Sequence, residues 1–175
     1  QRHPEDPDRT RAVTHTIRAA SPGDLPVLFA YLGDQLTENG RNGNPLFQPI
    51  PRTDDTVVPA AMRERFTLGL ATTLGEPGWR RAWIAVDADG AIAGHIDLRA
   101  LPDTHCRHRT TLGMGVHRDC RRLGIGSRLI DTAAAWAGET GFEWIDLEVL
   151  SANRSAIALY RRNGFHIIGE FADMY

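Results

Sequence analysis

The stretch VHRDCRRLGIGSRLI, residues 116–130, decides the fold class of this 175-residue chain. A strand pattern ends at its start, and a glycine-containing turn, Arg121–Gly126, leads directly into an amphipathic pattern that predicts a helix from Ile125 to Gly138. The first amides of such a helix lack intrahelical acceptors and lie at the positive end of the helix dipole. Because glycines let an anion approach the backbone closely, the turn is a candidate cradle for a pyrophosphate.

Two simpler interpretations of this turn stay open. It can be a purely structural connection between a strand and a helix, and its arginines can be an ordinary solvated helix end. Two other phosphate motifs are excluded. No Gly-Lys-Ser/Thr follows, so the turn is not a Walker loop, and Leu129 occupies the third glycine position of a dinucleotide fingerprint.

Outward from the turn, the sequence predicts strands and helices around one sheet. An Asp-Gly turn at 87–90 marks a hairpin. The expected strands are 15–20, 83–86, 91–98, 109–117, 144–150 and 165–171, and the expected helices are 22–36, one from Asp54 or Asp55 to 74, 125–138 and 155–162. Hairpin and crossover connections are mixed, which predicts an α/β (α+β) fold with a mostly antiparallel, twisted sheet of about six strands and helices on both faces.

Composition bounds the classes of protein. Hydrophobic residues make up 42% and charged residues 24%, which is typical of a globular protein, and we expect one domain over residues 15–175 after a disordered, proline- and charge-rich tail at 1–14. The net charge of −2 argues against a nucleic-acid partner. Two cysteines, Cys106 and Cys120, suit a reducing compartment. With no membrane-length apolar run and no signal pattern, we expect a cytoplasmic protein without a membrane partner.

A second constellation follows the predicted strand 144–150. Asn153 begins a helix, and Tyr160 lies seven residues later, nearly two helical turns away, so both side chains face the same side of the helix. A ligand running along that side would meet both. Taken alone, Tyr160 is as well explained as a packing residue with a solvated hydroxyl.

The two constellations together resemble the GNAT N-acetyltransferases, which carry a turn of the form Arg121-x-x-Gly124-x-Gly126 and, further on, Asn153 and a helix end like Ala158-Leu159-Tyr160-x-x-x-Gly164-Phe165. The resemblance covers about residues 15–171 and is strongest from Leu112. It implies a fold splayed between the fourth and fifth strands and acetyl-CoA as the co-substrate, with no metal.

The resemblance also implies roles for individual residues. The pyrophosphate would lie on the turn and the pantetheine arm along the preceding strand, where Gly113 and Gly115 predict a bulge. Asn153 would contact pantetheine, and Tyr160 would protonate the departing sulfur. The implied cofactor-binding residues are Met114, Gly115, Val116, Arg121, Arg122, Leu123, Gly124, Ile125, Gly126, Ser127 and Asn153.

The general base does not transfer from the family. Many members have a glutamate on the strand before the turn, where this chain has LGMGVH. The candidates are Glu148, His95, Asp97 and His117, with Glu148 and His95 preferred alongside Tyr160 as catalytic residues.

The end of the chain departs from the family pattern as well. Members usually finish with a seventh strand beside the fifth, whereas this sequence stops at Tyr175, soon after the sixth. Truncation, an open sheet edge, or a partner that supplies the strand, as in a homodimer, are the alternatives.

The substrate is a small-molecule or peptide amine whose identity the motifs do not give. We expect the glycine- and proline-rich loop 39–53, with Leu46, Phe47 and Ile50, to shape its pocket. The rival function is a non-catalytic acetyl-CoA-binding sensor on the same fold.

Overall fold

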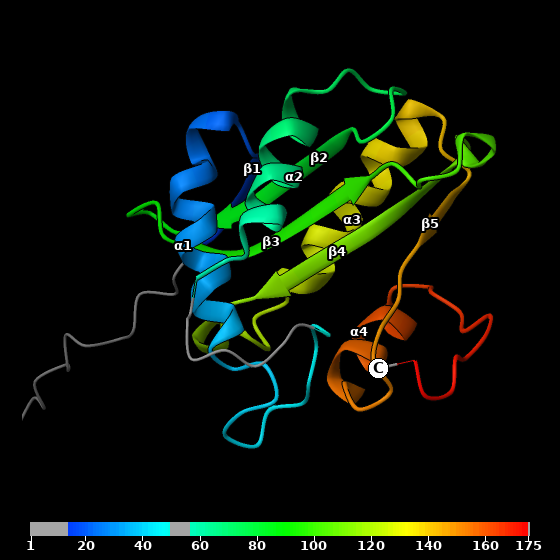
Figure 1. The fold of residues 1–175 in the computed structure, drawn as a ribbon. Helices are drawn as coiled ribbons and strands as arrows, with labels where there is room; N and C mark the ends of the chain where they lie inside the picture. The colour runs from blue at the N-terminus through cyan, green and yellow to red at the C-terminus, as the bar shows by residue number, and fades with distance from the viewer. Residues whose placement is uncertain (1–13, 50–56, 175) are drawn as a thin grey trace, which may run out of the picture.

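The computed structural model describes residues 14–49 and 57–174. Within them, one five-stranded sheet has the order β1-β2-β3-β4-β5 (Figure 1). The strands are β1 (Thr16–Ala19), β2 (Arg80–Val86), β3 (Ile92–Arg99), β4 (Arg109–Val116) and β5 (Trp144–Asp146). The helices are α1 (Leu25–Leu36), α2 (Ala60–Ala71), α3 (Ile125–Thr140) and α4 (Arg154–Arg162), with short 3₁₀ turns η1 (Pro22–Asp24), η2 (Thr104–Cys106) and η3 (Arg118–Cys120).

The helices cover both faces of the sheet, as predicted (Figure 1). On one face, Leu28 of α1 and Phe66 of α2 pack with Ile84 of β2 in one buried cluster. On the other face, Leu129 of α3 packs with Ile96 of β3 in a second cluster. The two apolar faces of the sheet are therefore buried by different helices, which gives a three-layer arrangement.

The sheet is antiparallel from β1 to β4 and parallel between β4 and β5. The predicted hairpin is confirmed: β2 and β3 pair along their length, and Gly90 donates its amide to Asp87 in the turn. The prediction of a bulge at Gly113 and Gly115 is wrong, because β3 and β4 pair without a register shift from Arg99 to Gly94.

β4 and β5 diverge, as the family resemblance implied. Their pairing covers only Arg109 to Thr111 of β4, although β4 continues to Val116 (Figure 1). The amide of His117 donates to Ala93 of the β3 side, so the alternate residues Met114 and Val116 direct their backbone groups toward the β5 side. No strand of the described residues lies beside them there.

Two predicted strands differ from the structure. The strand expected at 144–150 ends at Asp146, where the chain leaves β4. The sixth strand, expected at 165–171, does not form. This segment pairs with no described strand of the sheet, and Ile168 is 91% exposed. An apolar strand pattern becomes a strand only when another strand accepts its backbone groups, and none of the described strands is placed to do so.

Several expectations fall on residues outside those described. They are the disordered tail over residues 1–13, the Ile50–Thr53 part of the loop, the helix start at Asp54 or Asp55, and Tyr175. No helix among the described residues is long and apolar enough to cross a bilayer.

Candidate active site

The turn before α3 leads directly into the helix, as predicted. Gly124 is the N-cap of α3 and has a φ of 78°, in the left-handed region that glycine adopts without strain. Among the described residues, no side chain caps this helix end. The first amide with an acceptor in this helix is that of Arg128, which donates to the carbonyl of Gly124. The amides of Ile125, Gly126 and Ser127 therefore lack an intrahelical acceptor.

The second glycine of the turn has a packing role. A Cβ atom on Gly126 would lie 3.0 Å from Cδ2 of Leu159, which belongs to α4. Asn163, just after α4, donates to the hydroxyl of Ser127 at 3.1 Å. The turn is therefore also the surface on which α4 docks, which joins the two constellations found in the sequence.

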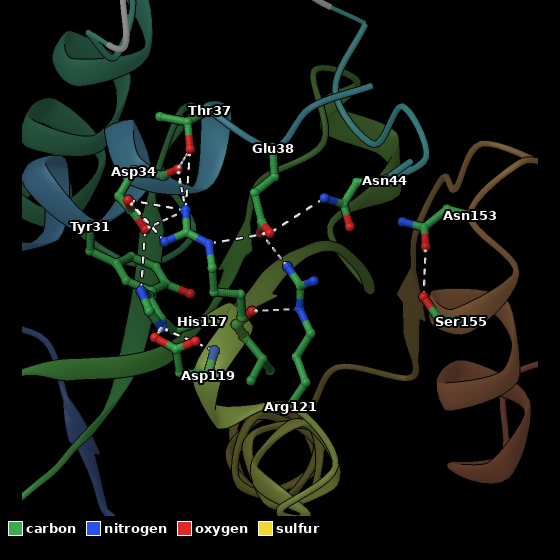
Figure 2. Close-up of polar contacts among 12 residues, drawn as sticks. Tyr31, Asp34, Thr37, Glu38, Asn44, His117, Asp119, Arg121, Asn153 and Ser155 are labelled. Atoms are coloured by element: carbon green, nitrogen blue, oxygen red, sulfur yellow. Dashed lines mark hydrogen bonds and ion pairs between the residues drawn. The ribbon is translucent and has the colours of Figure 1, made fainter. Parts of the chain in front are cut away.

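Two of the arginines near the turn, Arg121 and Arg128, contact other groups of the protein. Arg121 is paired with Glu38, just after α1, at 2.6 Å, and its Nε donates to the carbonyl of Val116 at 3.4 Å (Figure 2). Arg128 donates to the carbonyl of His15 at 2.9 Å, beside β1. The exposed Arg122 has a positive φ of 66°.

The C-terminal end of α1 is tied to the same region by a second group of ion pairs. Arg118 lies 3.0 Å from Asp34 and 3.2 Å from Glu38, and it donates to the hydroxyl of Thr37 (Figure 2). His117 lies 3.2 Å from Asp34. Sequence reasoning missed Asp34 and Glu38. Their signal was present: two carboxylates at a helix C-terminus oppose the helix dipole unless cations compensate them.

Tyr31 and His95 meet over Gly115. The Nδ1 of His95 lies 3.5 Å from the hydroxyl of Tyr31, and the two rings meet edge to face at 5.4 Å. A Cβ atom on Gly115 would lie 3.2 Å from the His95 ring and 3.4 Å from the Tyr31 hydroxyl. This close approach, and not a bulge, explains the glycine. Sequence reasoning missed Tyr31, since nothing in a helical pattern marks which tyrosine reaches across to a strand.

Burial fixes the protonation of this pair. It lowers the pKa of His95 to about 4 and raises the pKa of Tyr31 above its usual value, because both charged forms lose solvation. At neutral pH, His95 is therefore a neutral imidazole and Tyr31 a neutral phenol.

Asp97 lies beside this pair in a charged cluster. Its Oδ1 accepts from Arg80 at 2.8 Å and from Arg99 at 3.1 Å. Its Oδ2 faces Gly113, where a Cβ atom would lie 2.9 Å from that oxygen. Of the four base candidates, the structure brings His95 and Asp97 to the same strand face of β3, while His117 belongs to the ion pairs below α1.

Asn153 is the N-cap of α4, as expected. Its Oδ1 accepts from the amide of Ala156 at 3.3 Å and from the hydroxyl of Ser155 at 3.2 Å, while its amide nitrogen points away from Ser155 (Figure 2).

Tyr160 is half-buried, and its ring packs edge to face on Phe165 at 5.7 Å. Burial raises the pKa of Tyr160 to about 12, which keeps the phenol protonated. Glu148 is exposed, two residues beyond β5.

Two cavities lie near the described elements. One, of about 480 Å³, is lined by α1 and by the residues that lead into α2, and it includes Asp34 and Thr37. The other, of about 210 Å³, is lined by Trp79 and by Thr140–Phe142 at the far end of α3. A 16-residue helix is about 24 Å long, so this second cavity is remote from the turn.

Comparisons with known proteins agree with this arrangement. The model of the acetyltransferase (GNAT) family matches residues 52–165. The streptothricin acetyltransferase of Streptomyces lavendulae is 30% identical over 171 residues, which are 95% of this chain and 89% of that protein.

Solved structures share the fold. A GNAT-family acetyltransferase from Streptococcus pneumoniae has a TM-score of 0.69 at 25% identity, with 89% of this chain and 87% of that one covered. An acetyltransferase from Clostridium acetobutylicum, solved with acetyl-CoA, has a TM-score of 0.67 at 20% identity and covers 93% of this chain and 96% of that one. Because the family model spans more than half of the chain and the streptothricin relative nearly all of it, the chain belongs to the acetyltransferase (GNAT) family and is an N-acetyltransferase.

Proposed function

We propose that this N-acetyltransferase moves the acetyl group of acetyl-CoA directly onto a primary amine, with the pyrophosphate on the turn Arg121–Ser127. The observation that carries the proposal is the uncapped start of α3 next to a free edge of β4. The residues fit such a ligand. The amides of the turn suit phosphates, and the backbone groups of Met114 and Val116 suit an amide-bearing arm lying in the gap between β4 and β5.

Direct transfer has three requirements: a base that makes the amine neutral, a hydrogen-bond donor to the carbonyl oxygen, and a proton donor to the departing sulfur. We assign the oxygen to a backbone amide on the free edge of β4, at Met114 or Val116. Tyr160 supplies the proton to sulfur, which its protonated phenol allows. Asn153, with its amide nitrogen turned away from the helix cap, hydrogen-bonds the pantetheine arm.

The proton of the amine is proposed to go to Glu148, which is exposed two residues beyond β5. His95 is the alternative base. It is buried, it could reach a substrate only through the Tyr31 hydroxyl at 3.5 Å, and its pKa of about 4 makes it a weak proton acceptor at neutral pH. Replacing each by glutamine separates them, since loss of the base lowers kcat/KM most at low pH, where little amine is already neutral.

The amine itself is proposed to enter by α1 and the segment leading to α2, where the cavity lined by Asp34 and Thr37 lies. Streptothricin is the first compound to try, because of the relative that acetylates it. A small-molecule amine is favoured over a peptide. The free thiols of Cys106 and Cys120 fit a cytoplasmic location.

The test is thiol release from acetyl-CoA with a panel of streptothricin, aminoglycosides, polyamines, amino acids and peptides. Release that depends on one class of amine supports the proposal. If acetyl-CoA binds but no amine of the panel releases thiol, the sensor function replaces it.

A further inference from the structure

Two of the arginines near the turn are engaged by acids in this structure. Arg118 pairs with Asp34 and Glu38, and Arg121 pairs with Glu38. A phosphate that binds either guanidinium must therefore compete with a carboxylate. The contact of Arg121 with Glu38 is the easier one to open.

The two oxygens of Glu38 have different partners (Figure 2). Among the described residues, its Oε2 is bound by Arg121 alone, at 2.6 Å. Its Oε1 is held by Nε of Arg118 at 3.2 Å and faces the amide nitrogen of Asn44 at 3.5 Å. If Arg121 leaves, Glu38 keeps Arg118, so a side chain that is only 12% exposed is not left as an unpaired charge.

Arg121 is the more exposed member of the pair. Its side chain is 43% exposed, and within the described part of the chain it makes one further contact, a long hydrogen bond to the Val116 carbonyl. That carbonyl belongs to the free edge of β4, where the pantetheine arm is proposed to pair. In its present position, Arg121 therefore covers part of the ligand path while its guanidinium is engaged by Glu38.

We propose that Glu38 is a positioning residue that holds Arg121 across the end of β4 in the empty enzyme and gives it up to the pyrophosphate of acetyl-CoA. This inference rests on the proposed function of the turn. The exchange replaces one charge-assisted arginine–carboxylate contact by an arginine–phosphate contact, which can be bidentate, and it uncovers the Val116 carbonyl. Glu38 thus opposes ligand binding.

The test is calorimetry with acetyl-CoA on Glu38→Gln, an isosteric change that removes the charge. Because an ion pair of this exposure is worth up to about 1 kcal/mol, we expect acetyl-CoA to bind about two- to fivefold more tightly. In an Arg121→Gln background, Glu38→Gln should no longer tighten binding, since the competition passes through that guanidinium.

Asp119→Asn is the matched control. It removes an equal charge from the same region, but Asp119 is 80% exposed and contacts His117, not Arg121. The affinity of the Asp119→Asn protein for acetyl-CoA should stay near that of the wild type at physiological salt. Unchanged or weaker binding by Glu38→Gln would overturn the inference, as would an equal gain from Asp119→Asn. If the wild-type enzyme does not bind acetyl-CoA, the proposed function of the turn fails with it.

Discussion

Single side chains in the site are tuned mainly by burial. Burial raises the pKa of Tyr160 to about 12 and lowers the pKa of His95 to about 4, although the two residues lie on different elements. Tyr160 is therefore held as a protonated phenol and His95 as a neutral imidazole across the physiological range.

Tyr160→Phe is expected to lower turnover by about 10²- to 10⁴-fold, the usual loss when a general acid is removed. The ring remains to pack on Phe165, so stability and acetyl-CoA affinity should hardly change. Single-turnover kinetics, which report the chemical step, are the measurement. Wild-type rates in that assay would mean that Tyr160 only packs and that water protonates the sulfur.

His95 makes stability depend on pH. In the unfolded chain it takes up a proton near its ordinary pKa of 6.5, whereas the folded chain resists protonation down to about 4. We expect the free energy of unfolding to fall as pH drops from about 6.5 to about 4, by up to about 3 kcal/mol. Denaturant titrations across this range, compared with His95→Gln, measure it. The exposed His166→Gln is the control, and an equal slope in all three proteins would contradict the assignment.

The sequence predicted the residues of the glycine turn but not their side-chain partners. Gly124, Gly126 and Asn153 take the positions expected, because a helix start and a helix cap are local features. The pairing of Arg121 with Glu38 joins residues 83 positions apart, and the contact of Tyr31 with His95 joins residues 64 apart. No local pattern encodes such pairs.

Among the elements, the loop after α1 has its own internal support. The side chain of Asn39 accepts from the amides of Phe47 and Gln48 at 2.8 and 3.0 Å and donates to the carbonyl of Gln48 at 2.8 Å. Asn39 is itself buried. These hydrogen bonds hold Phe47 and Gln48, in the described part of the loop predicted to shape the amine pocket, against Asn39 just after α1.

Asn39→Ala should loosen this loop and cost about 1–3 kcal/mol of stability, because two amides lose their acceptor. We expect the relative kcat/KM values across the amine panel to change more than the acetyl-CoA affinity. Asn39→Asp keeps the acceptor oxygens and is the comparison. An unaltered amine profile with weakened acetyl-CoA binding would place the loop on the cofactor side instead.

The elements nearest the turn were predictable because their signals are short-range. β4, α3 and α4 begin or end within about two residues of the positions expected from apolar periodicity and capping. Strands 144–150 and 165–171 were overestimated, since a strand needs a neighbour and the pattern of one segment does not supply it.

On the scale of the whole molecule, the exposed apolar side chains after α4 are the largest departure from the expected sheet. They are Ile167, Ile168, Phe171 and Met174. The mixed, mostly antiparallel sheet, by contrast, follows from connection types that the sequence displays, and the gap beside β4 is what the family resemblance implied.

Binding of acetyl-CoA at the turn is tested most directly by calorimetry on Gly124→Val. Both Gly124 and Gly141 cap α3 with positive φ, 78° and 93°, and a Cβ atom on either meets open space, so Gly141→Val carries a similar backbone strain at the opposite end of the same helix. We predict that Gly124→Val loses about 10- to 100-fold in acetyl-CoA affinity, the equivalent of one hydrogen bond to a charged group, while Gly141→Val binds like the wild type. Unchanged affinity in a folded Gly124→Val protein would contradict the assignment of the turn.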